Sequence, residues 1–276
     1  MHYAVCNEMF GTTEFERAMG LLRTCGFEGA EIAPHTIFGD FAGSMSQGTT
    51  RIRNALQNEG LRFAGLHWLL VGPSDLHATS PDRRTWQRTW DHVARLIDLA
   101  GELGGGVMVF GSPTQRSSRG LSTPAEALER FIDGLSGVAD KALAANSRIL
   151  LEALGSGATD IVNTLEEVRQ ILRQITHPAI ETVFDFHNVD DETLSWSELI
   201  HEYASEFTHV HLNEIDGSAP SPHSAHLAQF RQAFDSLQRV DYQRWVSLEI
   251  FSVPEDAAAV LREVRAFLSQ VTEREV

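Results

Sequence analysis

Short apolar runs alternate with longer amphipathic stretches along the whole chain. The runs cover residues 3–6, 29–33, 62–70, 106–111, 148–154, 181–186, 208–213 and 245–250. A regular alternation of strand-like and helix-like segments is typical of a parallel β-sheet. Eight such units in a chain of 276 residues predict an α/β fold, a single (β/α)8 TIM barrel that spans residues 1–276.

The stretches between the runs carry signals for helix starts. In five of them a Ser or Thr is followed three residues later by a Glu, which is typical of a capping box. These pairs begin at Thr13, Thr123, Thr164, Ser195 and Ser252. Proline is favoured at the first helical position, so Pro81 and Pro124 predict helices that start directly after Ser80 and Thr123.

An open, doubly wound sheet is the alternative architecture for such a pattern. Its usual mark is a GxGxxG turn between the first strand and the first helix. Residues 6–11 of this chain read Cys-Asn-Glu-Met-Phe-Gly instead. The pattern therefore favours the closed barrel.

Four consecutive runs, the fifth to the eighth, carry polar residues at or near their carboxyl ends. They are Glu152, Asp185, His211 and Glu249. In a TIM barrel these ends meet at one face, where catalytic residues are found. Carboxylates are rarely buried unless they are paired or bind a cation, so the four together predict a metal site. Three carboxylates and one imidazole suit a hard or borderline divalent ion, with Mn²⁺ favoured over Co²⁺, Mg²⁺ or Zn²⁺.

Composition and charge exclude several classes of function. Asp and Glu number 38 against 22 Lys and Arg, a net charge of −16, and no basic stripe offers a nucleic-acid footprint. Lys141 is the only lysine and lies in a helical pattern, which argues against Schiff-base aldolase chemistry. Two cysteines, no signal peptide and no apolar run of about 18 residues predict a cytoplasmic protein without a membrane span.

The four strand-end residues and their surroundings, LLEA, FDFHN, HVHLNE and SLEIF, resemble the xylose-isomerase-like TIM-barrel superfamily of sugar isomerases and epimerases. The branch most similar is that of the ketose 3-epimerases and hydroxypyruvate isomerases. The resemblance covers essentially the whole chain. It implies that Glu152, Asp185, His211 and Glu249 hold one divalent metal ion and that Glu152 and Glu249 form the acid/base pair. It also implies a sugar or polyol ketone as substrate and a homodimer or homotetramer.

Elementary chemistry agrees with that assignment. A bound metal can polarise a carbonyl and a neighbouring hydroxyl, so that a carboxylate can remove the proton between them. Two glutamates on opposite faces of the enediolate then give epimerisation, and delivery to the adjacent carbon gives isomerisation. Two alternatives remain open. One is a lyase of the inosose dehydratase type, in which the same enolate expels a leaving group. The other is a catalytically silent barrel that binds a sugar.

Other polar and aromatic residues are candidates for contacts with the substrate. They are Glu31, His67, Trp68, His187, Asn188, Asn213, Glu214 and Arg116, with Phe110 and Phe251 as further candidates for the pocket wall. His209 shares a strand face with His211 and is expected to lie deeper. Arg119 is an alternative to Arg116 as an anion-binding group.

Two positions depart from the ketose 3-epimerase pattern. Asn188 stands three residues after Asp185, where those enzymes have a histidine, and Gly217 stands six residues after His211, where they have an arginine. Both departures argue against a simple ketohexose as substrate.

The endonuclease-IV type of barrel uses three metals and many histidines. His67 matches one of its ligands, but Phe110-Gly111-Ser112 ends the fourth run without a histidine.

Overall fold

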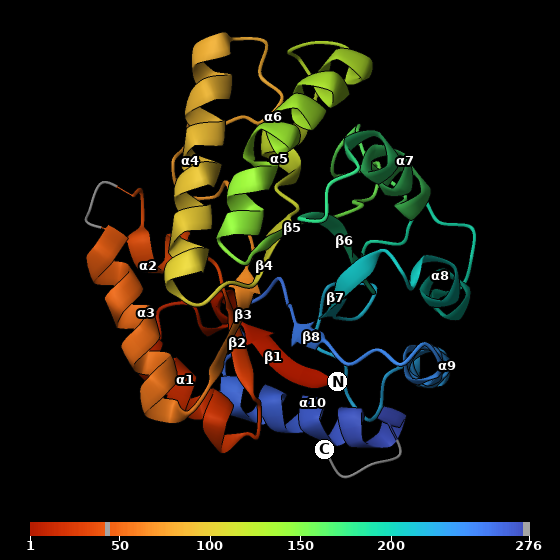
Figure 1. Ribbon diagram of the computed structural model, residues 1–276. Coiled ribbons are helices and arrows are strands. Elements are labelled where there is room, and N and C mark those ends of the chain that lie inside the picture. The colour runs from red at the N-terminus through yellow and green to blue at the C-terminus, as the bar shows by residue number, and fades with distance from the viewer. Residues whose placement is uncertain (42–44, 273–276) are drawn as a thin grey trace.

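Eight parallel strands close into a barrel in the computed structural model, which describes residues 1–41 and 45–272 (Figure 1). They follow one another around the barrel in chain order, and β8 pairs with β1 to close it. The strands are β1 (His2–Cys6), β2 (Gly29–Ile32), β3 (Arg62–Leu66), β4 (Val107–Phe110), β5 (Arg148–Leu151), β6 (Ile180–Asp185), β7 (Phe207–Leu212) and β8 (Trp245–Leu248). The predicted TIM barrel is confirmed.

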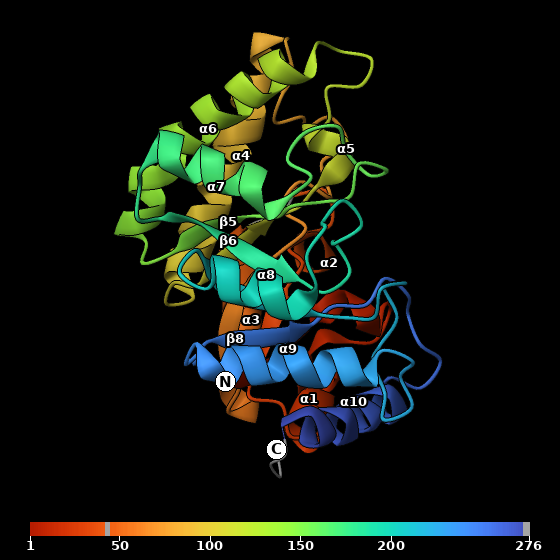
Figure 2. The ribbon, with the colours of Figure 1, turned by 90° about the vertical axis from the view of Figure 1, so that its right-hand side faces the viewer.

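Helices ring the barrel in the order of the chain, and Figures 1 and 2 place the last of them, α10, beside α1. The larger ones are α1 (Phe15–Thr24), α3 (Met45–Glu59), α4 (Arg83–Glu102), α6 (Pro124–Ala144), α7 (Leu165–Ile175), α8 (Trp196–Tyr203), α9 (Leu227–Arg239) and α10 (Ala257–Thr272). Short helical turns follow three strands: η1 (Asn7–Phe10), α2 (His35–Phe38) and α5 (Pro113–Arg116). Within the described residues, no helix combines the length and the apolar character needed to cross a membrane.

The starts of α6, α7 and α8 were predicted correctly, and in each a Thr or Ser hydroxyl caps the helix. Thr123 and Ser195 form full capping boxes, and Pro124 stands in the first turn of α6. Thr164 accepts a hydrogen bond from the Glu167 amide at 3.2 Å, but the Glu167 carboxylate turns to another amide, that of Asn163.

Three predicted starts were wrong, and at two of them, α4 and α10, an aspartate accepts the capping hydrogen bond instead of the predicted hydroxyl. α4 begins after Asp82, whose side chain accepts from the Thr85 amide at 2.9 Å, so Pro81 lies before the helix. α10 begins beyond Ser252, and Asp256 accepts from the Ala259 amide at 2.9 Å. α1 is preceded by Glu14 rather than Thr13.

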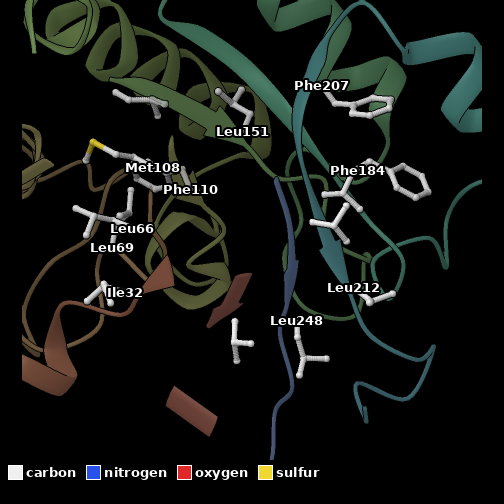
Figure 3. Packing of buried hydrophobic residues seen from close by; sticks show 14 of the residues in the cluster. Ile32, Leu66, Leu69, Met108, Phe110, Leu151, Phe184, Phe207, Leu212 and Leu248 are labelled. Atoms are coloured by element: carbon white, nitrogen blue, oxygen red, sulfur yellow. The ribbon is translucent and has the colours of Figure 1, made fainter. Parts of the chain in front are cut away.

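The main hydrophobic core lies between the strands and the ring of helices. Figure 3 shows part of it, with Met108, Phe110, Leu151 and Phe184 from β4, β5 and β6. Side chains alternate between the two faces of a strand. A second, small cluster of Val109, Leu150 and Val183 therefore occupies the opposite face, inside the barrel.

That alternation also sets the direction of the candidate site residues. Asp185 stands two residues after Val183 and Glu152 two residues after Leu150, so both carboxylates share the inner face with that cluster. The apolar cluster fills part of the barrel below them. The polar side chains are thereby held at the carboxyl end of the barrel, where its loops begin.

Candidate metal centre and substrate cavity

The four strand-end residues converge inside the carboxyl end of the barrel. Asp185 ends β6, His211 lies in β7, and Glu152 and Glu249 directly follow β5 and β8. One donor atom from each lies within 4.8 Å of the others. All four are buried, from 0% exposed for His211 to 6% for Glu152.

The imidazole of His211 faces the three carboxylates. Its Nδ1 lies 3.0 Å from Glu249 Oε2, 3.7 Å from Glu152 Oε1 and 3.7 Å from Asp185 Oδ2. This nitrogen has no hydrogen-bond partner. Within residues 1–41 and 45–272, neither a lysine nor an arginine forms an ion pair with these carboxylates. A buried cluster of like charges with an orphaned ring nitrogen is the donor set that a divalent cation satisfies.

The pKa shifts within the cluster reflect the same excess of negative charge. Burial, together with the neighbouring Asp185 and Glu249, raises the pKa of Glu152 to about 8. Burial opposes protonation of His211, but the carboxylates of Glu249 and Glu31 outweigh it and raise the pKa of this imidazole well above its ordinary value. Without a cation, the cluster therefore retains protons to compensate its charge.

Glu31 lies deeper than this cluster. Its Oε1 lies 3.0 Å from His211 Nε2 and its Oε2 lies 2.7 Å from His209 Nε2. All three residues are fully buried. Glu31, a candidate for substrate contact, is thus turned inward behind His211, and His209 occupies the deeper position expected of it.

Sequence reasoning missed Glu8, which lies in η1 beyond β1. Its Oε2 is 2.7 Å from Nε2 of the buried His67. Although burial of His67 favours its neutral form, Glu8 raises the pKa of this imidazole to about 9. A carboxylate that closely follows a strand could have pointed to Glu8, as it did to Glu152 and Glu249. Glu8, however, stands two residues past the end of β1.

A cavity of about 390 Å³ opens beside the carboxylates. Of the predicted substrate contacts, His67, Trp68, His187 and Asn188 line it together with Glu152 and Glu249. His67 and Trp68 follow β3, which ends at Leu66 rather than continuing to residue 70 as predicted. Phe251, a predicted wall residue, also lines the cavity.

Two hydrogen bonds connect these lining residues to the carboxylates. Trp68 Nε1 donates to Glu249 Oε1 at 3.1 Å. Asn188 Nδ2 donates to Asp185 Oδ2 at 2.9 Å and to Glu152 Oε1 at 3.3 Å. Asn188 thereby orients two of the candidate metal ligands.

Gly111 makes room for Glu152. A Cβ atom at this position would lie 2.1 Å from Glu152 Oε2, closer than any non-bonded contact allows. The absence of a side chain after β4 is thus a condition for the placement of Glu152.

Four predicted substrate contacts do not line the cavity. They are Glu31, Arg116, Asn213 and Glu214. Arg116 is fully buried and donates to the carbonyls of Phe110 and Val162, at 3.2 and 3.3 Å. Asn213 is buried with both amide atoms unpartnered, and Glu214 contacts His226 Nδ1 at 3.0 Å. Phe110 belongs to the hydrophobic core, because its side chain faces the helices.

Comparison with known proteins identifies the architecture. The family model described as "Xylose isomerase-like TIM barrel" matches residues 19–271. No curated protein matches the sequence.

Solved structures with the same fold include enzymes of different activity. The 3-keto-D-glucoside 4-epimerase YcjR from E. coli superposes with a TM-score of 0.82 at 18% identity, over 99% of each chain. D-Psicose 3-epimerase from Clostridium cellulolyticum H10, solved with D-tagatose, has a TM-score of 0.83 at 16% identity, over 100% of this chain and 99% of that one. An AP endonuclease of family 2 from Brucella melitensis has a TM-score of 0.77 at 20% identity, over 94% and 96%. At these identities the likeness concerns the fold, so the chemistry has to be inferred from the site.

Proposed function

Because the chain belongs to the xylose isomerase-like TIM-barrel family, we propose that it is a divalent-metal-dependent isomerase or epimerase of a sugar or polyol ketone. The reaction is the transfer of a proton at a carbon next to the carbonyl. The observation that carries the proposal is the convergence of Glu152, Asp185, His211 and Glu249 beside a cavity of small-molecule size. Sugar epimerases among the structures of the same fold support it.

The four converging residues are the proposed ligands of one divalent ion, with Mn²⁺ favoured. Three carboxylate oxygens and a ring nitrogen are the donors that such ions accept. The orphaned Nδ1 of His211 supports this assignment. When bound, the ion supplies a positive charge that polarises a carbonyl and lowers the pKa of the adjacent C–H.

Glu152 and Glu249 are the proposed acid/base pair. Both carboxylates line the cavity, so both are within reach of a bound substrate. A carboxylate held beside the substrate can take up and deliver a proton at the carbon next to the carbonyl. Trp68 orients Glu249 and Asn188 orients Glu152 through the hydrogen bonds described above.

Deuterium exchange tests the proposal. We expect the Mn²⁺-loaded protein to incorporate solvent deuterium next to the carbonyl of at least one ketone in a panel of ketoses, with an epimer or isomer as product. Glu152→Gln should reduce the exchange rate by about 100- to 10,000-fold. Glu129→Gln, which changes an exposed glutamate on α6, is the matched control and should have no effect.

Two results would redirect the proposal. A dehydrated product in the mass spectrum would indicate the lyase alternative, in which the enolate expels a leaving group. Metal-loaded protein that exchanges no deuterium into any ketone would contradict the proposed enzymatic activity and favour a silent sugar-binding barrel.

We also propose a cytoplasmic setting, which the free cysteines Cys6 and Cys25 support, and a homodimer or homotetramer.

A further inference from the structure

The cavity wall combines a polar and an apolar portion. Beside the carboxylates, exposed surface in the cavity comes largely from apolar side chains. These include Trp68, Val71, Pro113, Leu154, Ala158 and Phe251. A free ketose carries a hydroxyl on nearly every carbon, and a hydroxyl held against an apolar wall loses its hydrogen bonds to water without replacement.

Two aromatic rings of this wall are unusually accessible for their size. Trp68 is 36% exposed and Phe251 is 47% exposed. The indole of Trp68 is fixed by its hydrogen bond to Glu249 and by stacking on His35, with ring centroids 5.9 Å apart. The ring of Phe251 contacts His187 edge-on at 4.9 Å. Rings fixed in advance offer an apolar surface to a ligand with little further loss of entropy.

Phe251 also occupies the space next to Gly217. A Cβ atom at position 217 would lie 2.2 Å from Phe251 Cδ2, and Gly217 has a φ of +78°, a conformation that favours glycine. A longer polar side chain therefore cannot extend from residue 217 past this ring. The wall at this point is aromatic instead of hydrogen-bonding.

In the described part of the chain, the cavity offers no lysine or arginine to an anionic substituent, and the imidazole of His67 in its wall is already paired with Glu8 at 2.7 Å. The guanidinium groups nearest in sequence are already engaged. Arg116 donates to the carbonyls of Phe110 and Val162, and Arg119 to those of Ser156 and Gly157. A phosphate would therefore lie near the carboxylates of Glu152 and Glu249 without a lysine or arginine to pair with.

From these observations we propose that the cavity takes a neutral keto sugar with an apolar substituent, such as an aryl glycoside of a hexose that carries a ketone at a ring carbon other than the anomeric one. The keto sugar lies at the carboxylates, and the substituent packs against Trp68 and Phe251. The volume of about 390 Å³ falls in the range of about 300–1,000 Å³ for pockets that enclose drug-sized ligands. This inference rests on the proposed function and narrows it to a substrate class.

Calorimetric binding to the full-length protein in the presence of Mn²⁺ tests the inference. The probes are the methyl and phenyl glycosides of one hexose with a ketone at a non-anomeric ring carbon, a free ketohexose and the phosphate of that ketohexose. We expect the phenyl glycoside to bind at least about tenfold more tightly than the methyl glycoside, since even one methylene in an apolar pocket changes selectivity by about 10–200-fold. Phe251→Ala should remove most of that difference, and Leu143→Ala, at an exposed residue of α6, should leave it unchanged.

The outcomes separate this inference from the proposed function. Equal affinities for the methyl and phenyl glycosides, tighter binding of the phosphate than of the free ketohexose, or no binding of any probe would overturn the inference. Deuterium exchange into the free ketohexose would still support the proposed function in each of these cases. A preference for the phenyl group without any deuterium exchange would support the apolar site and contradict the enzyme.

Discussion

Glu31 Oε1 lies 3.0 Å from Nε2 of His211, across the interior of the barrel. The second oxygen of Glu31 is held by His209 at 2.7 Å. This arrangement leaves Nδ1 as the nitrogen of His211 that faces Glu152, Asp185 and Glu249. A carboxylate that accepts from the far nitrogen of a ligating histidine fixes the orientation of its ring and raises its basicity.

Glu31→Gln should therefore weaken Mn²⁺ binding by about 10–100-fold. An amide keeps the shape of the side chain but has only one acceptor oxygen. The ring nitrogens of His209 and His211 each contact a separate oxygen of Glu31, so one of them would lose its acceptor. Calorimetric titration with Mn²⁺ measures the effect, and NMR of the His211 ring nitrogens reports the change of tautomer. Glu129→Gln is the control, and an unchanged affinity and tautomer in Glu31→Gln would refute the role of Glu31.

Gly111→Ala should disturb the centre without touching any ligand. The added methyl overlaps Glu152 Oε2, so the carboxylate has to move, and a displacement of about 1 Å costs about 100-fold in rate. Overpacking should also lower the free energy of unfolding by about 1–3 kcal/mol.

The matched control for that variant is Gly137→Ala in α6, where a Cβ meets nothing within 4 Å. It should stabilise the protein by about 0.5–1 kcal/mol, because alanine favours the helix. Deuterium exchange and urea denaturation measure both effects. Wild-type exchange in Gly111→Ala would show that the position of Glu152 is adaptable.

Metal binding should strengthen as the pH rises towards about 8. Glu152 has a raised pKa of about 8 in the metal-free protein, and the pKa of His211 is raised as well. A cation has to displace these protons in order to bind. Below pH 8, the apparent affinity for the metal should therefore fall by about tenfold for each unit that the pH is lowered, per proton displaced.

Above its pKa, Glu152 is already ionised and no longer releases a proton when the metal binds. The affinity for the metal should therefore depend less steeply on pH in this range. Calorimetry in buffers with different heats of ionisation counts the protons released. An affinity for Mn²⁺ that is constant between pH 6 and pH 8 would be incompatible with this account.

Arg116→Met should lower stability rather than alter the substrate site. The guanidinium donates to two buried carbonyls, and loss of these donors should cost about 1–3 kcal/mol of the free energy of unfolding. Arg119→Met, at an exposed residue of the same loop, should change stability by less than about 0.5 kcal/mol. Urea denaturation gives both values. Wild-type stability of Arg116→Met together with loss of sugar binding would return Arg116 to the role predicted from sequence.

The sequence by itself determined the barrel and the convergence of the four central residues. Apolar runs recur with helix-like segments between them, and parallel strands in a closed barrel end at one face. Polar residues at the ends of four successive runs therefore had to meet. The predicted barrel was confirmed. α4 and α10 begin later than predicted because Asp82 and Asp256 accept the capping hydrogen bonds, and the end of β3 and the start of α1 also differ by a few residues.

Only the tertiary structure decided which polar residues pair across the barrel. Glu31 and His209 are 178 positions apart, and Glu8 and His67 are 59 apart. Periodicity along a strand gives the face on which a side chain lies, but not the partner that approaches from another strand. The same limit placed Arg116 on backbone carbonyls instead of in the cavity, since its nearest acceptors come from segments that meet only after the barrel has closed.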